Sequence, residues 1–430
     1  MTYSDEVRKL LDSAGAVDGS MVELKTAGHT YEGRLMPHLE SSASDIVVLK
    51  MESGYDVGLK VRSGASVKVL DGPLEIPKRK VEVKDKSGRP NISLISAGGT
   101  VVSFVDFYTG TVHPAEDTAD VLGAFPELAD LANIHAKILF STYSENMGAE
   151  QWQKLADCVA EEINNGADAV IIPHGTDTME YTAAALSFML GDVPKPVVLV
   201  GAMKPASCPS SDAITNLTAA IKFCTDSGKA GVFVVMHDTL GDDSFAVHLG
   251  TRVRKMHTSR RDAFESINAS PAAHVDAAGK VELLQDLRDS SDGKAVARTA
   301  MEKDVVLLQY HPDMDPSLYR DVILKSKGVV ISGTGLGNVG AQMLPLIREA
   351  CDKGIVVVMA SQCIRGAVNL NVYDNGKAAA AAGAVSAKDM LPEVAYVKLR
   401  WALANSKSRE EAVEIMKTPV ARETCERRLF

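Results

Sequence analysis

An unbroken apolar run, a short polar turn and a second apolar run form the most informative pattern in the chain. Residues 167–173 (ADAVIIP) predict a central strand, because strands buried on both faces lack the alternation of half-exposed ones. Residues 179–190 predict a buried helix, and Asp177 or Thr178 is placed to cap its first turn. The polar turn between them, residues 174–178, therefore lies where open α/β sheets bind ligands.

The same alternation of strand and helix extends through most of the chain. Strands are predicted at 92–96, 196–200 and 231–236, with helices at 150–164 and 212–225. This order is typical of a doubly wound parallel sheet that is covered on both faces. A smaller set repeats the scheme, with strands at 305–309, 328–332 and 355–360 and helices at 316–326, 340–352, 392–404 and 408–416. Residues 238–277 show no regular pattern.

The first eighty residues have a different organisation. After a short helix at 6–13, brief β-like runs follow one another closely between Gly, Ser and Asp turns, at 21–26, 31–37, 45–51, 56–61 and 66–70. Closely spaced short strands of this kind predict a small β-barrel of the SH3 or Sm type. We expect four segments: the barrel (1–80), a polar linker (81–90), a first α/β domain (91–290) and a second α/β domain with terminal helices (298–430).

Composition narrows the possible classes of protein. At 430 residues, with 46% hydrophobic and 24% charged residues, the chain is typical of a globular protein with a large core. We expect a cytoplasmic protein without a membrane partner, because no apolar run could cross a bilayer and the N-terminus does not resemble a signal peptide. Six scattered cysteines without a CxxC pair predict free thiols, and ten histidines show no metal-ligand spacing. A net charge of −10 argues against this chain being the main nucleic-acid-binding surface.

Candidate chemistry gathers at two strand ends and one basic segment. Gly98-Gly99-Thr100 directly follows the strand at 92–96, so Thr100 would lie near Thr176 if the two strands are neighbours. A threonine hydroxyl needs a base within hydrogen-bond reach, and that base needs an orienting group. Lys255 and Asp177 could fill these roles, with nearby arginines favouring the neutral amine. The alternative is a Gly-Gly turn, a helix cap and a solvated lysine.

Nucleotide-binding motifs give little support to a nucleotide site. Gly335, Gly337 and Gly340 match GxGxxG after a strand, but the next strand ends in Ser361-Gln362 rather than in an acidic residue. No GxxxxGK[ST] segment is present. We therefore expect no nicotinamide or flavin site and no ATP site in this chain.

With these motifs assembled, residues 88–425 resemble the bacterial-type L-asparaginase/glutaminase family. The resemblance is carried by GGT at 98–100, by HGTDTM at 174–179 and by PVVLVGAMKP at 196–205. It implies two doubly wound α/β domains. It also implies that Thr100 is the nucleophile and that Thr176, Asp177 and Lys255 form the proton relay.

The resemblance also implies substrate-binding positions. The turn that grips the substrate corresponds to Ser144 and Glu145, followed by Asn146-Met147. Further substrate-binding positions are Gly99, Gly175, Ala202 and, from the partner protomer of a homodimer, Asn338. The chain departs from the family pattern in three places: Ala97 replaces a threonine, Glu145-Asn146 replaces the usual pair, and the expected loop tyrosine falls at Thr111, with Tyr108 nearest.

The chain as a whole resembles the D-subunit family of archaeal glutamyl-tRNA(Gln) amidotransferases. The resemblance is carried by an N-terminal barrel ahead of an asparaginase-like body and by the segments FSTYSENM and HLGTRVRKMHTSRRDAF. That resemblance implies hydrolysis of glutamine or asparagine and transfer of ammonia to an E subunit, which uses ATP and Mg²⁺ to amidate Glu-tRNA(Gln). It implies a heterodimer of dimers, with no cofactor and no metal in this chain. Two alternatives stay open: a free-standing L-asparaginase and a non-catalytic scaffold with this fold.

Overall fold

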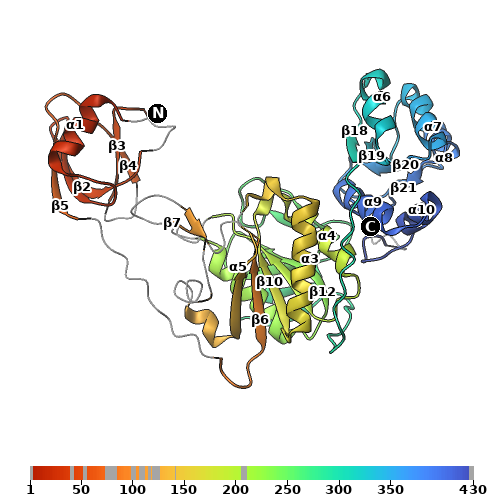
Figure 1. Ribbon diagram of the computed structural model, residues 1–430, viewed down its shortest axis with the longest axis horizontal. Coiled ribbons are helices and arrows are strands. Elements are labelled where there is room, and N and C mark those ends of the chain that lie inside the picture. Colours follow the sequence, from red (N-terminus) through yellow and green to blue (C-terminus); the bar gives the residue numbers. More distant parts are fainter. Residues whose placement is uncertain are drawn as a thin grey trace.

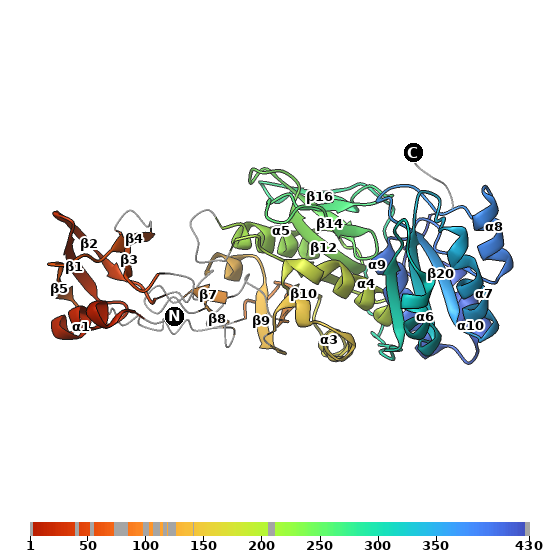
Figure 2. The same ribbon diagram turned by 90° about the horizontal axis from the view of Figure 1, so that it is seen from above.

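The computed structural model describes residues 3–38, 43–51, 56–72, 85–97, 103–105, 112–114, 118, 126–140, 142–204 and 211–425. A small N-terminal β-rich domain is followed by a large and then a smaller α/β domain (Figures 1 and 2). Each has a buried apolar core of its own, and one further core cluster joins the two α/β domains. This order of domain types agrees with the order of the sequence patterns.

The N-terminal domain is all-β apart from one helix, as predicted. Helix α1 (Asp5–Ala14) begins at Ser4, whose side chain accepts a hydrogen bond from the amide of Val7. The antiparallel sheet has the order β4-β3-β2-β1-β5, with β1 (Met21–Thr26), β2 (His29–Leu35), β3 (Ile46–Lys50), β4 (Asp56–Lys60) and β5 (Ser66–Asp71). Leu24, Leu35 and Leu49 are fully buried under it. This domain therefore has a core that it does not share with the α/β domains.

The large domain is built on an eight-stranded sheet of order β17-β16-β13-β12-β11-β10-β6-β9. Its parallel part comprises β6 (Asn91–Ser96), β9 (Asn133–Ile138), β10 (Ala169–Pro173), β11 (Pro196–Val200) and β12 (Gly231–His237). Beyond β12 the pairing is antiparallel, through β13 (Ser244–Leu249), β16 (Ala273–Asp276) and β17 (Val281–Leu283). The prediction of an irregular segment over 238–277 is therefore wrong, and the sheet is mixed rather than wholly parallel.

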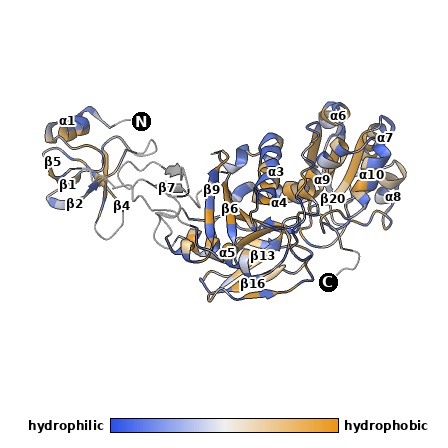
Figure 3. Ribbon diagram, turned by 60° about the horizontal axis from the view of Figure 1, so that its bottom comes forward, coloured by the Kyte–Doolittle hydropathy of each residue, from blue (hydrophilic) through white to orange (hydrophobic). Residues whose placement is uncertain are grey.

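Helices cover both faces of the parallel strands. Helices α3 (Ala149–Asn164) and α4 (Met179–Leu190) pack on one face, and α5 (Ala213–Asp226) packs on the other. Helix α4 is buried on nearly all sides, because α9 of the smaller domain packs against it. Figure 3 shows the hydrophobic colouring of α4. A helix that is apolar all round is expected in such a central position.

The smaller domain contains a four-stranded parallel sheet, β18-β19-β20-β21. Its strands are β18 (Val305–Gln309), β19 (Gly328–Gly333), β20 (Val356–Ser361) and β21 (Val385–Ser386), and its helices are α6 (Pro316–Lys325), α7 (Leu344–Asp352), α8 (Asp374–Ala381), α9 (Pro392–Asn405) and α10 (Arg409–Lys417). The predicted scheme is confirmed, but α8 and β21 have no equivalent in it. Helix α7 begins at Leu344 rather than near residue 340, after a 3₁₀ turn, and it has a proline in its first turn, where the missing amide is tolerated.

Several short elements complete the chain, mostly in the large domain. They are β7 (Ser103–Val105), β8 (Val112–Pro114), β14 (Val253–Lys255), β15 (Phe264–Ser266) and the 3₁₀ turns η1 (Pro126–Asp130), η2 (Ser144–Asn146), η3 (Thr176–Thr178) and η4 (Ala341–Met343). Two of these turns, η2 and η3, contact each other. The β14–β15 hairpin and these two turns carry most of the described candidate site.

Candidate active site

Two neighbouring strands bring the two signature segments to the same edge of the sheet. Strands β6 and β10 pair in parallel, and the amide of Ala97 donates to the carbonyl of Pro173 at 3.3 Å. Ala97 therefore lies beside Pro173, which confirms that the two strand ends are neighbours. Gly99 and Thr100 themselves lie outside the described residues, as do Tyr108 and Thr111.

Thr176, Asp177 and Lys255 form a hydrogen-bonded cluster at this edge. The Nζ atom of Lys255 lies 2.8 Å from Oγ1 of Thr176 and 2.7 Å from Oδ1 of Asp177. The lysine side chain is only 10% exposed, whereas that of Asp177 is 71% exposed. A partly buried amine that contacts a hydroxyl and a carboxylate has the geometry that proton transfer requires.

The predicted helix cap is not formed. Thr178 occupies the N-cap position of α4, but neither its side chain nor that of Asp177 accepts a bond from the first turn. The hydroxyl of Thr178 donates instead to the carbonyl of Ser144 at 2.6 Å. The 3₁₀ turn η3 between strand and helix directs these side chains towards η2 and Lys255 rather than back onto the helix.

Close packing explains two glycines of this edge. A Cβ atom on Gly175 would lie 2.7 Å from Cβ of Ser144, so only glycine lets η2 approach the strand end. A Cβ atom on Gly201, which follows β11, would lie 2.7 Å from Cγ2 of Thr176 and 2.5 Å from Cε of Met179. Both glycines therefore fix the position of neighbouring site residues through close contact.

A buried hydrogen-bond chain supports the turn from below. The indole of Trp152 donates to Thr182 at 3.0 Å, and Thr182 lies 2.9 Å from Nε2 of His174. The other ring nitrogen of His174 lies 2.6 Å from the carbonyl of Gly175. Burial lowers the pKa of His174 to about 4. The ring is therefore neutral at neutral pH, and it can accept from Thr182 while donating to the carbonyl.

A second buried network holds the loop that contains Ala202. The carboxylate of Asp212 accepts bonds from the amides of Met203 and Lys204 at 2.9 Å each. Asn216 donates to the carbonyl of Gly201 at 3.0 Å. Asp212 and Asn216 are both fully buried. The loop beside Thr176 is thus fixed by side chains that sequence reasoning did not select.

The arginines around Lys255 each bind a carboxylate. Arg252 is 2% exposed and binds the carboxylate of Asp389 at 2.9 Å and the carbonyl of Arg422 at 2.9 Å. The others face separate carboxylates, in the pairs Arg254–Glu393, Arg260–Asp262 and Arg261–Asp242. Arg252 instead ties the start of β14 to the C-terminal segment, and Lys255 pairs with Phe264 in the hairpin.

The remaining predicted residues have different positions. Ser144 is buried beside Gly175, and Glu145 is exposed in the same turn. Asn338 belongs to the smaller domain, where its carbonyl accepts a bond from the amide of Thr334 at 2.8 Å. The hydrogen bonds described above for the Thr176 cluster do not include Asn338.

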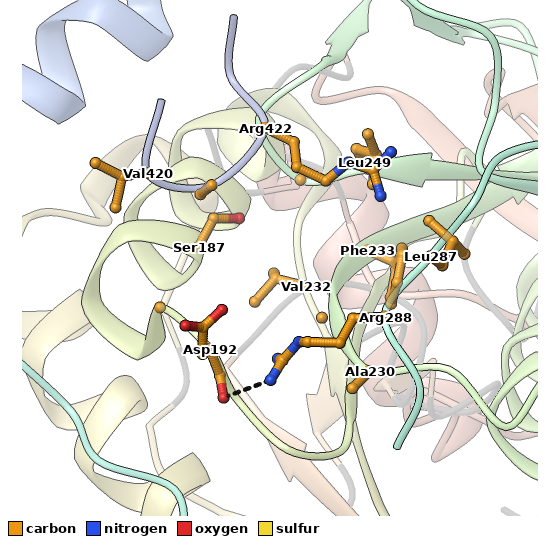
Figure 4. A pocket seen from close by; sticks show the side chains of 14 residues that line it. Ser187, Asp192, Ala230, Val232, Phe233, Leu249, Leu287, Arg288, Val420 and Arg422 are labelled. Atoms are coloured by element: carbon orange, nitrogen blue, oxygen red, sulfur yellow. Dashed lines mark hydrogen bonds between the residues drawn. The ribbon is translucent and has the colours of Figure 1, made fainter. Parts of the chain in front are cut away.

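Other features lie away from the cluster. Figure 4 shows a hollow between the end of α4, the start of β12 and residues 420–422, in which Arg288 donates to the carbonyl of Asp192. It lies at the opposite edge of the sheet and is lined by none of the predicted site residues.

Within the described part of the chain, no cluster of three or more potential ligands could hold a metal ion. In the same residues, no helix is both long and apolar enough to span a membrane.

Fold and site together define an asparaginase-type α/β protein. Residues 91–288 match the family "Asparaginase, N-terminal", residues 304–416 match "Glutaminase/Asparaginase C-terminal domain", and residues 16–70 match "GatD N-terminal domain". Among solved structures, the thermostable L-asparaginase from Thermococcus kodakarensis is 31% identical with a TM-score of 0.71, over 78% of this chain and 100% of that chain.

Curated relatives extend the similarity over nearly the whole chain. The D subunit of glutamyl-tRNA(Gln) amidotransferase from Pyrococcus abyssi is 44% identical over 92% of this chain and 91% of its own length. The corresponding protein from Methanothermobacter thermautotrophicus is 42% identical over 99% of this chain and 98% of its own length. The chain therefore belongs to the D-subunit family of glutamyl-tRNA(Gln) amidotransferases, which confirms the resemblance drawn from the motifs.

Proposed function

We propose that this chain is the glutaminase subunit of a tRNA-dependent amidotransferase. It hydrolyses the side-chain amide of glutamine and supplies ammonia to a partner subunit that converts Glu-tRNA(Gln) to Gln-tRNA(Gln). The observation that carries the proposal is the Thr176–Lys255–Asp177 cluster at the strand edge where Ala97, two residues before Gly99 in the sequence, lies beside Pro173. The relationship to named D subunits over almost the full chain supplies the substrate class.

In the proposed mechanism, Thr100 is the nucleophile. Its hydroxyl oxygen attacks the amide carbon of glutamine while its proton passes to the neutral amine of Lys255, through the hydroxyl of Thr176. The proton then goes to the departing nitrogen, so that ammonia leaves and an acyl-enzyme remains. Water attacks the ester, glutamate leaves, and Thr100 regains its proton. Asp177 orients the lysine and stabilises its charged form between these transfers.

Partners and cofactors follow the same proposal. The partner is an E subunit, which uses ATP and Mg²⁺ to activate the glutamate carboxylate and which binds Glu-tRNA(Gln). Two copies of each subunit form a heterodimer of dimers, and in the homodimer of this chain Asn338 completes the site of the other protomer. Its location in the smaller domain, outside the hydrogen bonds of the Thr176 cluster, is compatible with that arrangement.

Substitutions of the nucleophile and the base test the proposal in the assembled complex. Thr100→Ala and Lys255→Met are expected to lower glutamine-dependent amidation by at least 10²-fold, because nucleophile and base each act in the transition state. Amidation with added ammonia should persist at the wild-type rate. Lys325→Met removes an exposed lysine in α6 and serves as the matched control. Equal loss with both nitrogen donors would contradict the assignment.

A second candidate is a free-standing L-asparaginase, favoured by the fact that the chain covers the full length of solved L-asparaginases. Ammonia release from asparagine by the isolated chain, unchanged by partner or tRNA, would support that function instead. The match of residues 16–70 to the GatD N-terminal domain favours the amidotransferase. Ammonia release from glutamine in the complete complex would exclude a non-catalytic scaffold.

A further inference from the structure

Two glutamates from different domains are buried side by side behind Lys255. Glu180 lies in the first turn of α4 and Glu393 in the first turn of α9, and these helices pack against each other. They are 8% and 5% exposed. Acidic residues are favoured near helix N-termini, but that preference does not explain the burial of two carboxylates at one domain boundary.

Within the described residues, one oxygen of each carboxylate lacks a hydrogen bond. Arg254 reaches Glu393, with a nitrogen 3.4 Å from each carboxylate oxygen. Within the described part of the chain, Oε2 of Glu180 and Oε1 of Glu393 are buried and have no hydrogen-bond partner. A buried carboxylate oxygen without a hydrogen bond makes the anion costly and the protonated form less so.

The groups that face this pair come from three elements. Burial has the largest effect on the pKa of Glu180. The charge of Glu393, from α9, raises this pKa further, and the charges of Arg254 and Lys255, from β14, lower it. Two tyrosines lie in the same environment, Tyr181 of α4 and Tyr396 of α9. Burial and then the charges of both glutamates raise the pKa of Tyr181. Burial raises the pKa of Glu180 to about 7, and burial also raises that of Glu393. The ionisation of Glu180 therefore falls near neutral pH.

We infer that Glu180 is a positioning residue for the proton relay. Its protonation state, set jointly with Glu393 and Arg254, changes the charge that Lys255 faces in addition to the carboxylate of Asp177 at 2.7 Å. An ionised Glu180 adds a negative charge beside the relay and makes proton release from it harder, whereas a protonated Glu180 adds no such charge. Because Glu393 comes from the second α/β domain, the packing of α4 against α9 couples the domain boundary to the relay. The inference rests on the proposed role of Lys255.

Two isosteric variants in the assembled complex test this inference through the pH dependence of glutamine hydrolysis. Glu180→Gln removes the negative charge near Lys255, so the limb of kcat/KM that rises with pH should move to lower pH by about half a unit to one unit. Glu393→Gln removes the like charge that hinders ionisation of Glu180. Its rising limb should stay in place or move to higher pH, and the double variant should behave like Glu180→Gln.

Opposite responses of the two variants distinguish charge coupling from simple packing. A uniform loss of kcat in both variants, with the limb unmoved, would overturn the inference. If Glu180→Gln does not fold, Glu393→Gln alone decides. A rising limb of kcat/KM that moves to lower pH in Glu393→Gln would contradict the inference, because removal of Glu393 should make Glu180 easier to ionise. Infrared difference spectra between pH 5 and pH 8 provide a readout without activity, since the protonated carboxyl signal that is lost near pH 7 should be absent in Glu180→Gln.

Failure of the proposed function gives a different result. In that case the wild-type complex releases no ammonia from glutamine at any pH, while the infrared signal still reports whether Glu180 holds a proton at neutral pH. If the complex is active but the infrared signal of Glu180 shows no change near pH 7, the proposed function stands and this inference falls.

Discussion

Burial has opposite consequences for the two titratable residues that flank the HGTDTM turn. His174 and Glu180 are both almost fully buried. Burial disfavours the charged form of each group, so the pKa of the imidazole falls to about 4 while that of the carboxyl rises to about 7. His174 is thereby a fixed hydrogen-bonding group at neutral pH, whereas Glu180 changes its charge there. Of these two residues, Glu180 is therefore the one that can respond to pH near neutrality.

The raised pKa of Glu180 also makes a prediction for stability. Its pKa in the folded protein is about 7, above the ordinary value near 4.5. The folded state therefore holds this proton more tightly, so its contribution is fully present below pH 4.5 and is lost as pH rises through 7. Glu180→Gln has no such loss. At pH 8 it should be more stable than wild type by on the order of 1 to 3 kcal/mol, with little difference at pH 5.

Thermal unfolding at pH 5 and pH 8 checks this expectation. The melting temperature of Glu180→Gln should exceed that of wild type only at the higher pH. Glu150→Gln, which removes an exposed carboxylate from α3, is the control and should show no growing difference of this kind. A gain for Glu180→Gln of the same size at both pH values would point to better packing rather than to proton linkage.

At the scale of elements, the site depends on how closely three loops approach one another. Gly201 follows β11 and contacts both Thr176 and the first residue of α4, so a methyl group there has no free space. Gly201→Ala should displace Thr176 and lower glutamine hydrolysis roughly 10- to 100-fold, with a stability cost of about 1 to 3 kcal/mol. Steady-state kinetics of ammonia release and thermal unfolding measure the two effects.

Gly72→Ala is the matched control, because a Cβ atom at Gly72 meets nothing within 4 Å. It should leave both the rate and the melting temperature unchanged. Wild-type hydrolysis by Gly201→Ala would show that the loop after β11 can shift without disturbing the hydroxyl of Thr176.

The sequence was a good guide to elements with strong local patterns and a poor one where long-range packing decides. Parallel strands such as β10 and β11 are continuous apolar runs, so their bounds could be predicted closely. The antiparallel strands β13, β16 and β17 and the separate β14–β15 hairpin lie among turns, and their pairing with other strands defines them. Lys255 could be selected from its motif. The pairing of Arg254 with Glu393, 139 residues apart, could not.

At the scale of the whole molecule, the C-terminal segment joins the two α/β domains. Lys398 and Glu423 form a fully buried ion pair at 2.5 Å, and the hydroxyl of Thr251 donates to the carbonyl of Ala421 at 2.9 Å. Arg252, at the start of the hairpin that carries Lys255, binds the same segment. The two α/β domains thus share a core and are joined by the contacts of the C-terminal segment, so we expect them to unfold together.

The N-terminal domain has no share in that core, which leads to the last prediction. Leu24 is completely buried among the residues of its own domain. Leu24→Ala should cost about 2 to 5 kcal/mol of that domain's stability. In a domain of this size, such a loss lowers the melting temperature by about 10 °C or more. Calorimetry should therefore show the N-terminal transition at a lower temperature while the α/β transition stays in place, and glutamine hydrolysis should survive unfolding of the N-terminal domain.

Leu70→Ala, at a 42% exposed position of the same domain, should change neither transition. If Leu24→Ala instead lowers a single transition of the whole chain, the small domain is energetically coupled to the asparaginase-type body and contributes to the stability of the active site.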